Sequence, residues 1–310
     1  MSVTKRHLGA FLFGNGCMLL ATMFWGVNVA VTKALIPAWM TSDGVSATRL
    51  VGGCILFWLA SCFMKCERIE RGDWGKIILG GAVGLFAFIW LFVMSLRYGN
   101  AIDISIIMTL PPMFVLLMGV IFEKTRPSLL EYAGIAVSFA GAVVVILAGG
   151  AHAPAGSNNF LGDLLAVLSC VCYAFYLVIL EKPTHKYKPL SLLRWVFLFA
   201  AIPGLILVPG MENMTIIHAG AFIPWCEIGF ILLCPTFFAY FLVEPAIKNI
   251  GSELASLYQY LLPVFAAITA VLMGMEKLRL DQAVAMVIIV VGMLMTNIGK
   301  KRRIAGEKVS

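Results

Sequence analysis

The sequence predicts an all-α integral membrane protein with ten transmembrane helices, arranged as two inverted five-helix repeats. Three observations lead to this fold class. The chain is 61% hydrophobic and only 13% charged, whereas about a quarter of the residues in a soluble globular domain are charged. Apolar runs of roughly 20 residues, the length that a helix needs to cross a bilayer, recur from end to end. Two distant segments also share one unusual pattern, which indicates an internal duplication.

The duplicated segments are residues 101–124 and 252–277. Each is an apolar run broken by proline near its middle, and each ends on a Glu-Lys pair. When Pro112 is aligned with Pro263, at an offset of 151, small or polar residues align at i and i+4, and a methionine aligns with a glutamine at i+7; this spacing is one face of a helix. In the two segments these are Ala101, Ser105 and Met108, and Ser252, Ser256 and Gln259.

Five apolar runs follow one another in the first half of the chain. The first extends over residues 8–36, which is far longer than the apolar region of a secretory signal, so we interpret it as a retained span. The predicted spans of this half are residues 11–34, 44–64, 75–96, 101–122 and 129–149. The longest polar connection, residues 151–160, then separates the two halves.

The second half repeats this organisation. Its predicted spans are residues 161–181, 190–209, 219–243, 253–274 and 281–299. Because each half holds an odd number of spans, the halves must insert in opposite orientations. Inverted duplication is a transporter architecture, in which substrate is held near mid-membrane between the repeats. A small-residue face for close helix packing is also duplicated in the fifth and tenth spans, as Gly134 and Gly141, and as Ala285 and Gly292.

Basic residues set the expected orientation. Most of the 23 Lys and Arg residues lie in the segments that share a side with the N-terminus, so the positive-inside rule predicts that both termini are cytoplasmic. This distribution also explains the net charge of +7 without a nucleic-acid partner, because the basic residues sit in short loops rather than on one binding face.

The first predicted span contains the motif Met23-Phe24-Trp25-Gly26-Val27-Asn28, and the second contains Arg49. In both features the chain resembles the EamA-type branch of the drug/metabolite transporter (DMT) superfamily, which has a similar first-span motif and an arginine in its second span. Residues 97–101, Leu110-Pro111-Pro112 and Glu123-Lys124 are similar to the helix-four block, which residues 251–263 and 276–277 repeat.

The resemblance covers residues 17–148 as the first five-helix repeat and residues 162–299 as the second, with residues 1–10 and 300–310 as cytoplasmic tails. It implies an inverted-repeat exporter or facilitator of small metabolites such as amino acids. It also implies a central cavity lined by the first, third and fourth spans of each half.

Aromatic and amide side chains within the spans are the candidate substrate-binding residues. Trp25 and Asn28 lie three apart on one helix face, and at an offset of 148 they align with Tyr173 and Tyr176. Rings supply apolar area and a quadrupole for a cation, while amides and hydroxyls fix orientation. The alternative is that these rings pack helices together or form interfacial belts. The full candidate set is Trp25, Asn28, Trp90, Ser105, Thr109, Tyr173, Tyr176, Tyr258 and Gln259.

Prolines and ionisable residues add further candidates. Pro111, Pro112 and Pro263 remove backbone donors within their spans and predict helix kinks that shape the pathway. Arg49 is the most deeply embedded basic residue. It either attracts a carboxylate substrate or pairs with a neighbouring helix end, and we favour the pairing because charges in membranes usually have protein partners. Proton coupling stays open, with Asp103, Glu244 and Glu253 as the candidate proton sites.

The function that the sequence predicts is secondary transport of small metabolites, amino acids or related amphipathic compounds, across the cytoplasmic (inner) cell membrane by alternating access, with export as the expected direction. Sugars or nucleosides are an alternative substrate class, and a membrane enzyme or flippase acting on lipid is the alternative activity. Catalysis is poorly supported, because all four histidines fall in terminal or loop regions and no catalytic or phosphate-binding motif is present. We expect no cofactor and no metal. The expected partners are the lipid bilayer and the substrate, with the chain a monomer or homodimer.

Overall fold

A computed structural model describes residues 3–122, 127–151, 158–211, 221–243, 245–246, 249–250 and 258–307. Every regular element in these ranges is helical, as the sequence predicts. The first half comprises α1 (Val3–Leu35), α2 (Ser42–Phe63), a 3-10 turn η1 (Arg71–Asp73), α3 (Trp74–Leu79), a π-helical segment η2 (Gly80–Leu85), α4 (Phe86–Tyr98), α5 (Ala101–Ile107), α6 (Pro111–Phe122) and α7 (Leu129–Ala151).

The second half follows the same plan. It comprises α8 (Asn159–Lys186), α9 (Pro189–Gly204), a 3-10 segment η3 (Leu205–Met211), α11 (Phe222–Ile231), a π-helical segment η4 (Leu232–Phe238), a 3-10 turn η5 (Tyr258–Leu261), α13 (Leu262–Leu272) and α14 (Leu280–Glu307). The described residues contain nine helical segments long and apolar enough to span a bilayer. The shorter apolar helix Tyr258–Leu272 falls within the expected ninth span, whose first residues lie outside the described ranges.

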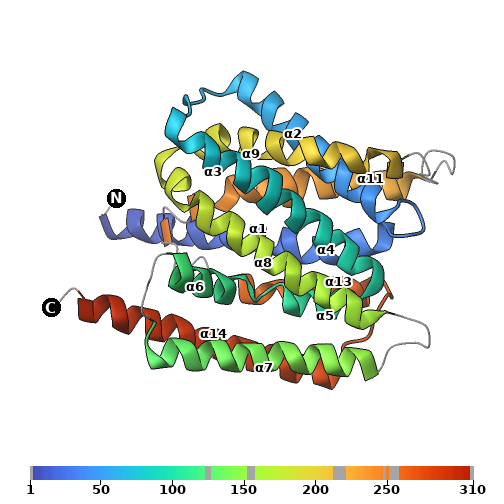
Figure 1. The fold of residues 1–310 in the computed structure, drawn as a ribbon, viewed down its shortest axis with the longest axis vertical. Helices are drawn as coiled ribbons and strands as arrows, with labels where there is room; N and C mark the ends of the chain where they lie inside the picture. Colours follow the sequence, from blue (N-terminus) through green and yellow to red (C-terminus); the bar gives the residue numbers. More distant parts are fainter. Residues whose placement is uncertain are drawn as a thin grey trace.

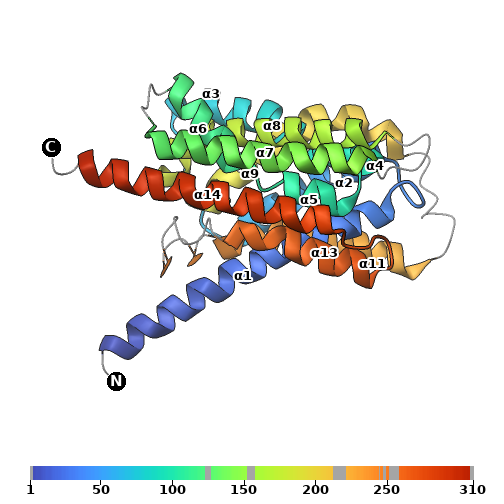
Figure 2. The same cartoon turned by 90° about the horizontal axis from the view of Figure 1, so that it is seen from below.

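The helices run side by side, and α7 and α14 form a pair along one edge, away from α2, α3 and α9 at the opposite edge (Figures 1 and 2). Val3, at the start of α1, and Glu307, at the end of α14, lie at the same end of the helices (Figure 1). The first helix extends eight residues before the expected boundary, and the last continues through the basic residues after position 299.

The third span of each half contains a π-helical segment, η2 in the first half and η4 in the second. The sequence did not predict these segments, because a single-residue change in helical pitch leaves the apolar pattern almost unchanged. Their corresponding places in the two halves support the duplication. A π-bulge widens one turn of a helix, and such turns are frequent at functional sites.

Prolines mark a change of helix in the fourth span. The span is divided into α5, which ends at Ile107, and α6, which begins at Pro111. Pro111 and Pro112 occupy the first turn of α6, where a missing N–H leaves no carbonyl unpaired within the helix. Pro263 likewise lies in the first turn of α13. The three prolines therefore stand at helix starts beside irregular turns rather than inside continuous helices.

The sequence predicts a small-residue face on each of the fifth and tenth spans, and in the structure these two faces pack against each other. A Cβ atom added to Gly292 would lie 2.5 Å from the backbone nitrogen of Ser138, and one added to Gly141 would lie 2.7 Å from the Ile289 side chain. The Ser138 hydroxyl donates to the Ile289 carbonyl at 3.4 Å. Only glycine permits this approach of the two backbones, and close packing of small residues is what drives helix association in lipid.

We expect Gly292→Ala to destabilise the protein by about 1–3 kcal/mol, the usual cost of overpacking. Gly229→Ala is the matched control, because a Cβ atom at Gly229 meets nothing within 4 Å. Thermal unfolding of both variants in detergent provides the measurement. Equal melting temperatures would contradict the close α7–α14 contact.

Candidate functional site

A cavity of about 670 Å³, including its open mouth, lies between the two halves of the chain. Residues of α1, α2, α4 and the α5–α6 turn contribute from the first half, and residues of α8, η4, η5 and α13 contribute from the second. The lining residues are Trp25, Asn28, Val29, Arg49, Phe88, Phe92, Met108, Pro111, Tyr173, Pro235, Tyr240, Gln259 and Leu262.

Trp25 joins the two halves at one wall of this cavity. Its indole Nε1 donates to the carbonyl of Pro235 at 3.1 Å, and its ring meets Tyr240 edge-on at 6.3 Å between centroids. Pro235 belongs to the π-helical segment η4, and the widened turn of such a segment exposes backbone carbonyls that a regular helix would use internally. The indole orientation is thus fixed by a backbone group of the other half.

A second wall is aromatic. The Tyr173 ring of α8 lies 4.6 Å from the Phe88 ring and 5.7 Å from the Tyr176 ring, measured between centroids. Tyr176 is buried behind this stack and does not line the cavity. Gly84, in η2, permits the close approach of η2 to Tyr176 in α8, since a Cβ atom at Gly84 would lie 2.9 Å from Cβ of Tyr176. The wall is therefore rigid and apolar.

Two amides add polarity to the cavity. The Asn28 Oδ1 accepts a hydrogen bond from the Thr32 hydroxyl at 3.2 Å, one turn along α1. The amide of Gln259 forms no hydrogen bond with any residue in the described part of the chain, and it faces the cavity from η5. An amide left unpaired by the protein is available to a bound molecule.

Arg49 is the charged member of the lining. It is 7% exposed, and its guanidinium carbon lies 5.8 Å from the centroid of the Phe92 ring. Its Nε has no hydrogen-bond partner, and no ion pair joins it to another residue within the described ranges. The pairing with a helix end that the sequence favours is not found among the described residues. An arginine at the centre of a membrane helix costs about 2.5–3.5 kcal/mol by insertion measurements.

Several predicted site residues lie outside the cavity lining, and their polar groups form hydrogen bonds with other groups of the protein. The Trp90 indole donates to Asp43 at 2.8 Å, and the Tyr258 hydroxyl donates to Asn15 at 2.6 Å. The Ser105 and Thr109 hydroxyls each donate to a carbonyl one turn earlier in the chain, at 2.7 Å. Ser256 lies outside the described residues. The structure thus brings Trp25, Asn28, Tyr173, Gln259 and Pro111 together around the cavity.

The cavity also includes residues that sequence reasoning did not place there. Phe88 and Phe92 carry no signal beyond their hydrophobicity, and Pro235 contributes through its position in a π-helical turn that the sequence does not reveal. Pro111, by contrast, is one of the predicted kink residues that shape the pathway, and with Met108 it brackets the turn between α5 and α6, so the broken span reaches the cavity at its break.

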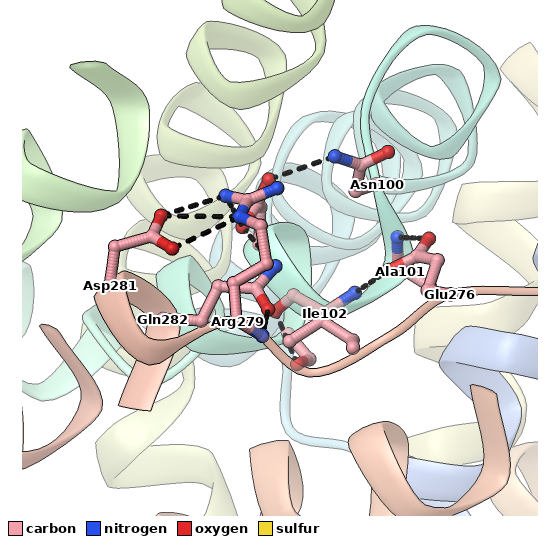
Figure 3. A network of polar contacts seen from close by, with 9 residues as sticks. Asn100, Ala101, Ile102, Glu276, Arg279, Asp281 and Gln282 are labelled. Carbon is pink, nitrogen blue, oxygen red and sulfur yellow. Dashed lines mark hydrogen bonds and ion pairs between the residues drawn. The ribbon is translucent and has the colours of Figure 1, made fainter. Parts of the chain in front are cut away.

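A polar network joins the start of α5 to the loop between α13 and α14 (Figure 3), at the end of the bundle opposite the two termini (Figure 1). The Glu276 carboxylate accepts from the backbone N–H groups of Ala101 and Ile102 at 2.6 and 3.0 Å. It thereby caps the start of α5 from the loop between α13 and α14. The cap is favourable because a carboxylate satisfies orphan N–H groups and complements the helix dipole.

Asp103 is the centre of the network. It accepts from Asn100 Nδ2 at 3.1 Å, from Gln282 Nε2 at 2.8 Å and from the Arg279 guanidinium at 3.4 Å. Arg279 also pairs with Asp281 at 3.0 Å, and its acidic neighbours raise the pKa of the guanidinium. These bonds tie α5 of the first half to α14 of the second.

Two neighbouring groups extend this network. The Lys33 Nζ donates to the carbonyls of Leu96 and Gly99 at 2.5 and 2.8 Å. It thereby satisfies carbonyl groups at the C-terminal end of α4. Asp163 is completely buried near Gly99, and neither of its carboxyl oxygens has a hydrogen-bond partner in the described part of the chain. Within the described part of the chain, no cluster of His, Cys, Asp and Glu side chains could hold a metal ion. The eight cysteines are free thiols.

An all-helical membrane bundle built from two like halves, with a mixed aromatic and polar cavity between them, defines a membrane transporter. The profile of the EamA-like transporter family matches the chain twice, over residues 12–147 and 160–298. The chain therefore belongs to the EamA-like transporter family.

Curated relatives agree with this family, and a solved structure shares the fold. The chain is 30% identical to an uncharacterized transporter of Archaeoglobus fulgidus over 223 residues, which cover 71% of this chain and 74% of that protein. It is 26% identical to the uncharacterized transporter YyaM of Bacillus subtilis over 232 residues, 74% of this chain and 75% of the relative. A crystal structure at 18% identity superposes with a TM-score of 0.63, over 94% of this chain and 98% of the other, which shows the shared fold.

Glu276 provides a test of this polar network. Glu276→Ala removes the acceptor for two N–H groups, so we expect a loss of about 1–2 kcal/mol of stability, as for an N-cap. Lys277→Ala, an exposed neighbour, should leave the melting temperature unchanged.

The pH dependence of stability follows from the same carboxyl. Burial raises the pKa of Glu276 above its ordinary value of 4.5, outweighing its backbone hydrogen bonds and Lys33. Because the folded state then holds the proton more tightly, this group makes stability fall as the pH rises from 4.5 through the folded pKa. Glu276→Gln should flatten that part of the profile, measured as melting temperature against pH. A profile unchanged from wild type would contradict the burial of this carboxyl.

Proposed function

We propose that the protein is a secondary transporter that moves amino acids or related amphipathic metabolites across the cytoplasmic membrane by alternating access, with export as its direction. The observation that carries the proposal is the cavity between the two halves. Its lining combines Trp25, Tyr173 and Gln259 from three different helical spans, as expected for a site that binds a small molecule at a repeat interface.

The polar network at one end supports alternating access. A transporter needs a seal on one side of its site that is strong enough to exclude water and still separable. Asp103, Arg279 and Gln282 join the halves at this end through hydrogen bonds and an ion pair. Such contacts exchange readily for water, so this end is suited to open and close.

Transport itself is tested with purified protein in liposomes. Counterflow of labelled amino acids is expected, and Trp25→Ala and Gln259→Ala should lower it roughly tenfold at low substrate, because each removes about 1.4 kcal/mol of contact. Trp90→Ala is a matched control, since its ring lies outside the cavity lining. A panel of amino acids and amphipathic cations that gives no protein-dependent flux would refute the proposal.

Orientation is tested by cysteine labelling in intact cells. Phe160 is exposed at the start of α8 and Arg302 is exposed near the end of α14. With both termini cytoplasmic, Phe160→Cys should react with an impermeant maleimide from outside, and Arg302→Cys only after permeabilisation. The wild-type protein, with its native thiols, gives the background. The reverse pattern would invert the proposed topology and, with it, the side that the polar network closes.

A further inference from the structure

We infer that the cavity recognises an organic anion, with Arg49 pairing with the substrate's carboxylate while the rings hold its apolar body. This inference rests on the proposed transport function and narrows its substrate class. The observation behind it is a buried cation that faces the cavity with no acidic partner among the described residues.

The charge of the cavity has one sign. Among its lining residues Arg49 is the only side chain with a full charge, and no aspartate or glutamate belongs to the described lining. A guanidinium does not lose its proton in a protein, so the positive charge persists in the low-dielectric interior. A cationic substrate would be repelled from this cavity, whereas an anion would neutralise it.

The geometry of the lining suits a carboxylate attached to an apolar group. Arg49 presents a planar fork of donors that matches a carboxylate, and its Nε is unoccupied. The guanidinium already lies against the Phe92 ring at 5.8 Å, which leaves its edge for hydrogen bonding. Phe88 and Tyr173 provide the adjacent apolar surface.

The dipole of the α6 helix adds to the positive electrostatic potential that Arg49 creates in the cavity. Its twelve residues begin at Pro111, which lines the cavity, so the positive end of its dipole points toward the site of the charge. By itself a helix terminus is weak evidence. Here it coincides with a buried arginine that lacks a protein partner.

The duplication shows that the fold does not require this cation. At the offset of 148 that aligns Trp25 with Tyr173, Arg49 aligns with Phe197. Phe197 is completely buried in α9 and packs against Phe57 at 4.8 Å between ring centroids. The same helix position is therefore apolar in one half and cationic in the other, and only the cationic copy faces the cavity.

The experiment compares carboxylates with their amides, which keep the body and remove the anion. The probes are phenylalanine with phenylalaninamide, leucine with leucinamide, and 3-phenylpropionate with 3-phenylpropionamide. Purified protein is assayed for ligand-dependent change in melting temperature and for counterflow. The carboxylate of at least one pair should stabilise the wild type and compete for flux, and its amide should bind roughly 10- to 100-fold more weakly.

Three variants locate the effect. Arg49→Gln should abolish the difference between carboxylate and amide, and Arg49→Lys should retain a reduced difference, because it keeps the charge without the fork. Arg97→Gln is the matched control, since Arg97 is an exposed arginine that contacts the Tyr98 ring away from the cavity. It should behave as wild type.

Stability without ligand separates a binding role from a structural one. If the role of Arg49 is to bind a substrate anion, its charge is uncompensated in the ligand-free protein. The Arg49→Gln variant lacks that buried charge, so it should melt at the same temperature as the wild type or higher. A lower melting temperature, or amides and cations that bind wild type as well as carboxylates, would overturn the inference while leaving transport intact. Absence of counterflow for every class of compound would instead refute the proposed function.

Discussion

The interior of a bilayer offers no water to backbone N–H and C=O groups, and this constraint governs where the helices of this protein are broken. Irregular backbone is tolerated at membrane depth only where it is buried in protein or lines a water-filled cavity. The α5–α6 turn and the η4 segment both reach the cavity through Met108, Pro111 and Pro235. In η4 a freed carbonyl is satisfied by the Trp25 indole of the other half. The breaks and the cavity therefore depend on each other.

The short half-helices created by these breaks need partners at their ends. The α5 helix has only seven residues, so it gains little from its own hydrogen bonds. Glu276 from the second half supplies the missing acceptors, and Asp103 anchors the same helix to Gln282. Under the proposed alternating access, opening this end would release the helix caps and shift α5 against α14, so that closure of the end and stability of the fold would be coupled.

The sequence predicts the fold far better than the site. Apolar length and the duplicated small-residue faces are properties of the chain itself, so the spans follow from them, whereas the pairing of α7 with α14 is seen only in the structure. The repeat alignment also locates Trp25, Asn28, Tyr173 and Gln259. Helical spacing gives a direction only relative to its own helix axis, however. It does not reveal that the indole of Trp90 meets Asp43 or that the hydroxyl of Ser105 bonds within its own helix.

The two halves share a fold but contribute unequally to the cavity. The first half supplies the charge through Arg49, and the second supplies an unpaired amide through Gln259. Inverted repeats that exchange conformations would move the entrance from one side to the other, yet the charge would remain on the first half in both states. A substrate anchored by one charge would thus keep a single orientation while access changes around it. Under the proposed alternating access, the shared fold of the two halves would provide two equivalent openings, and the asymmetric lining would provide one mode of binding.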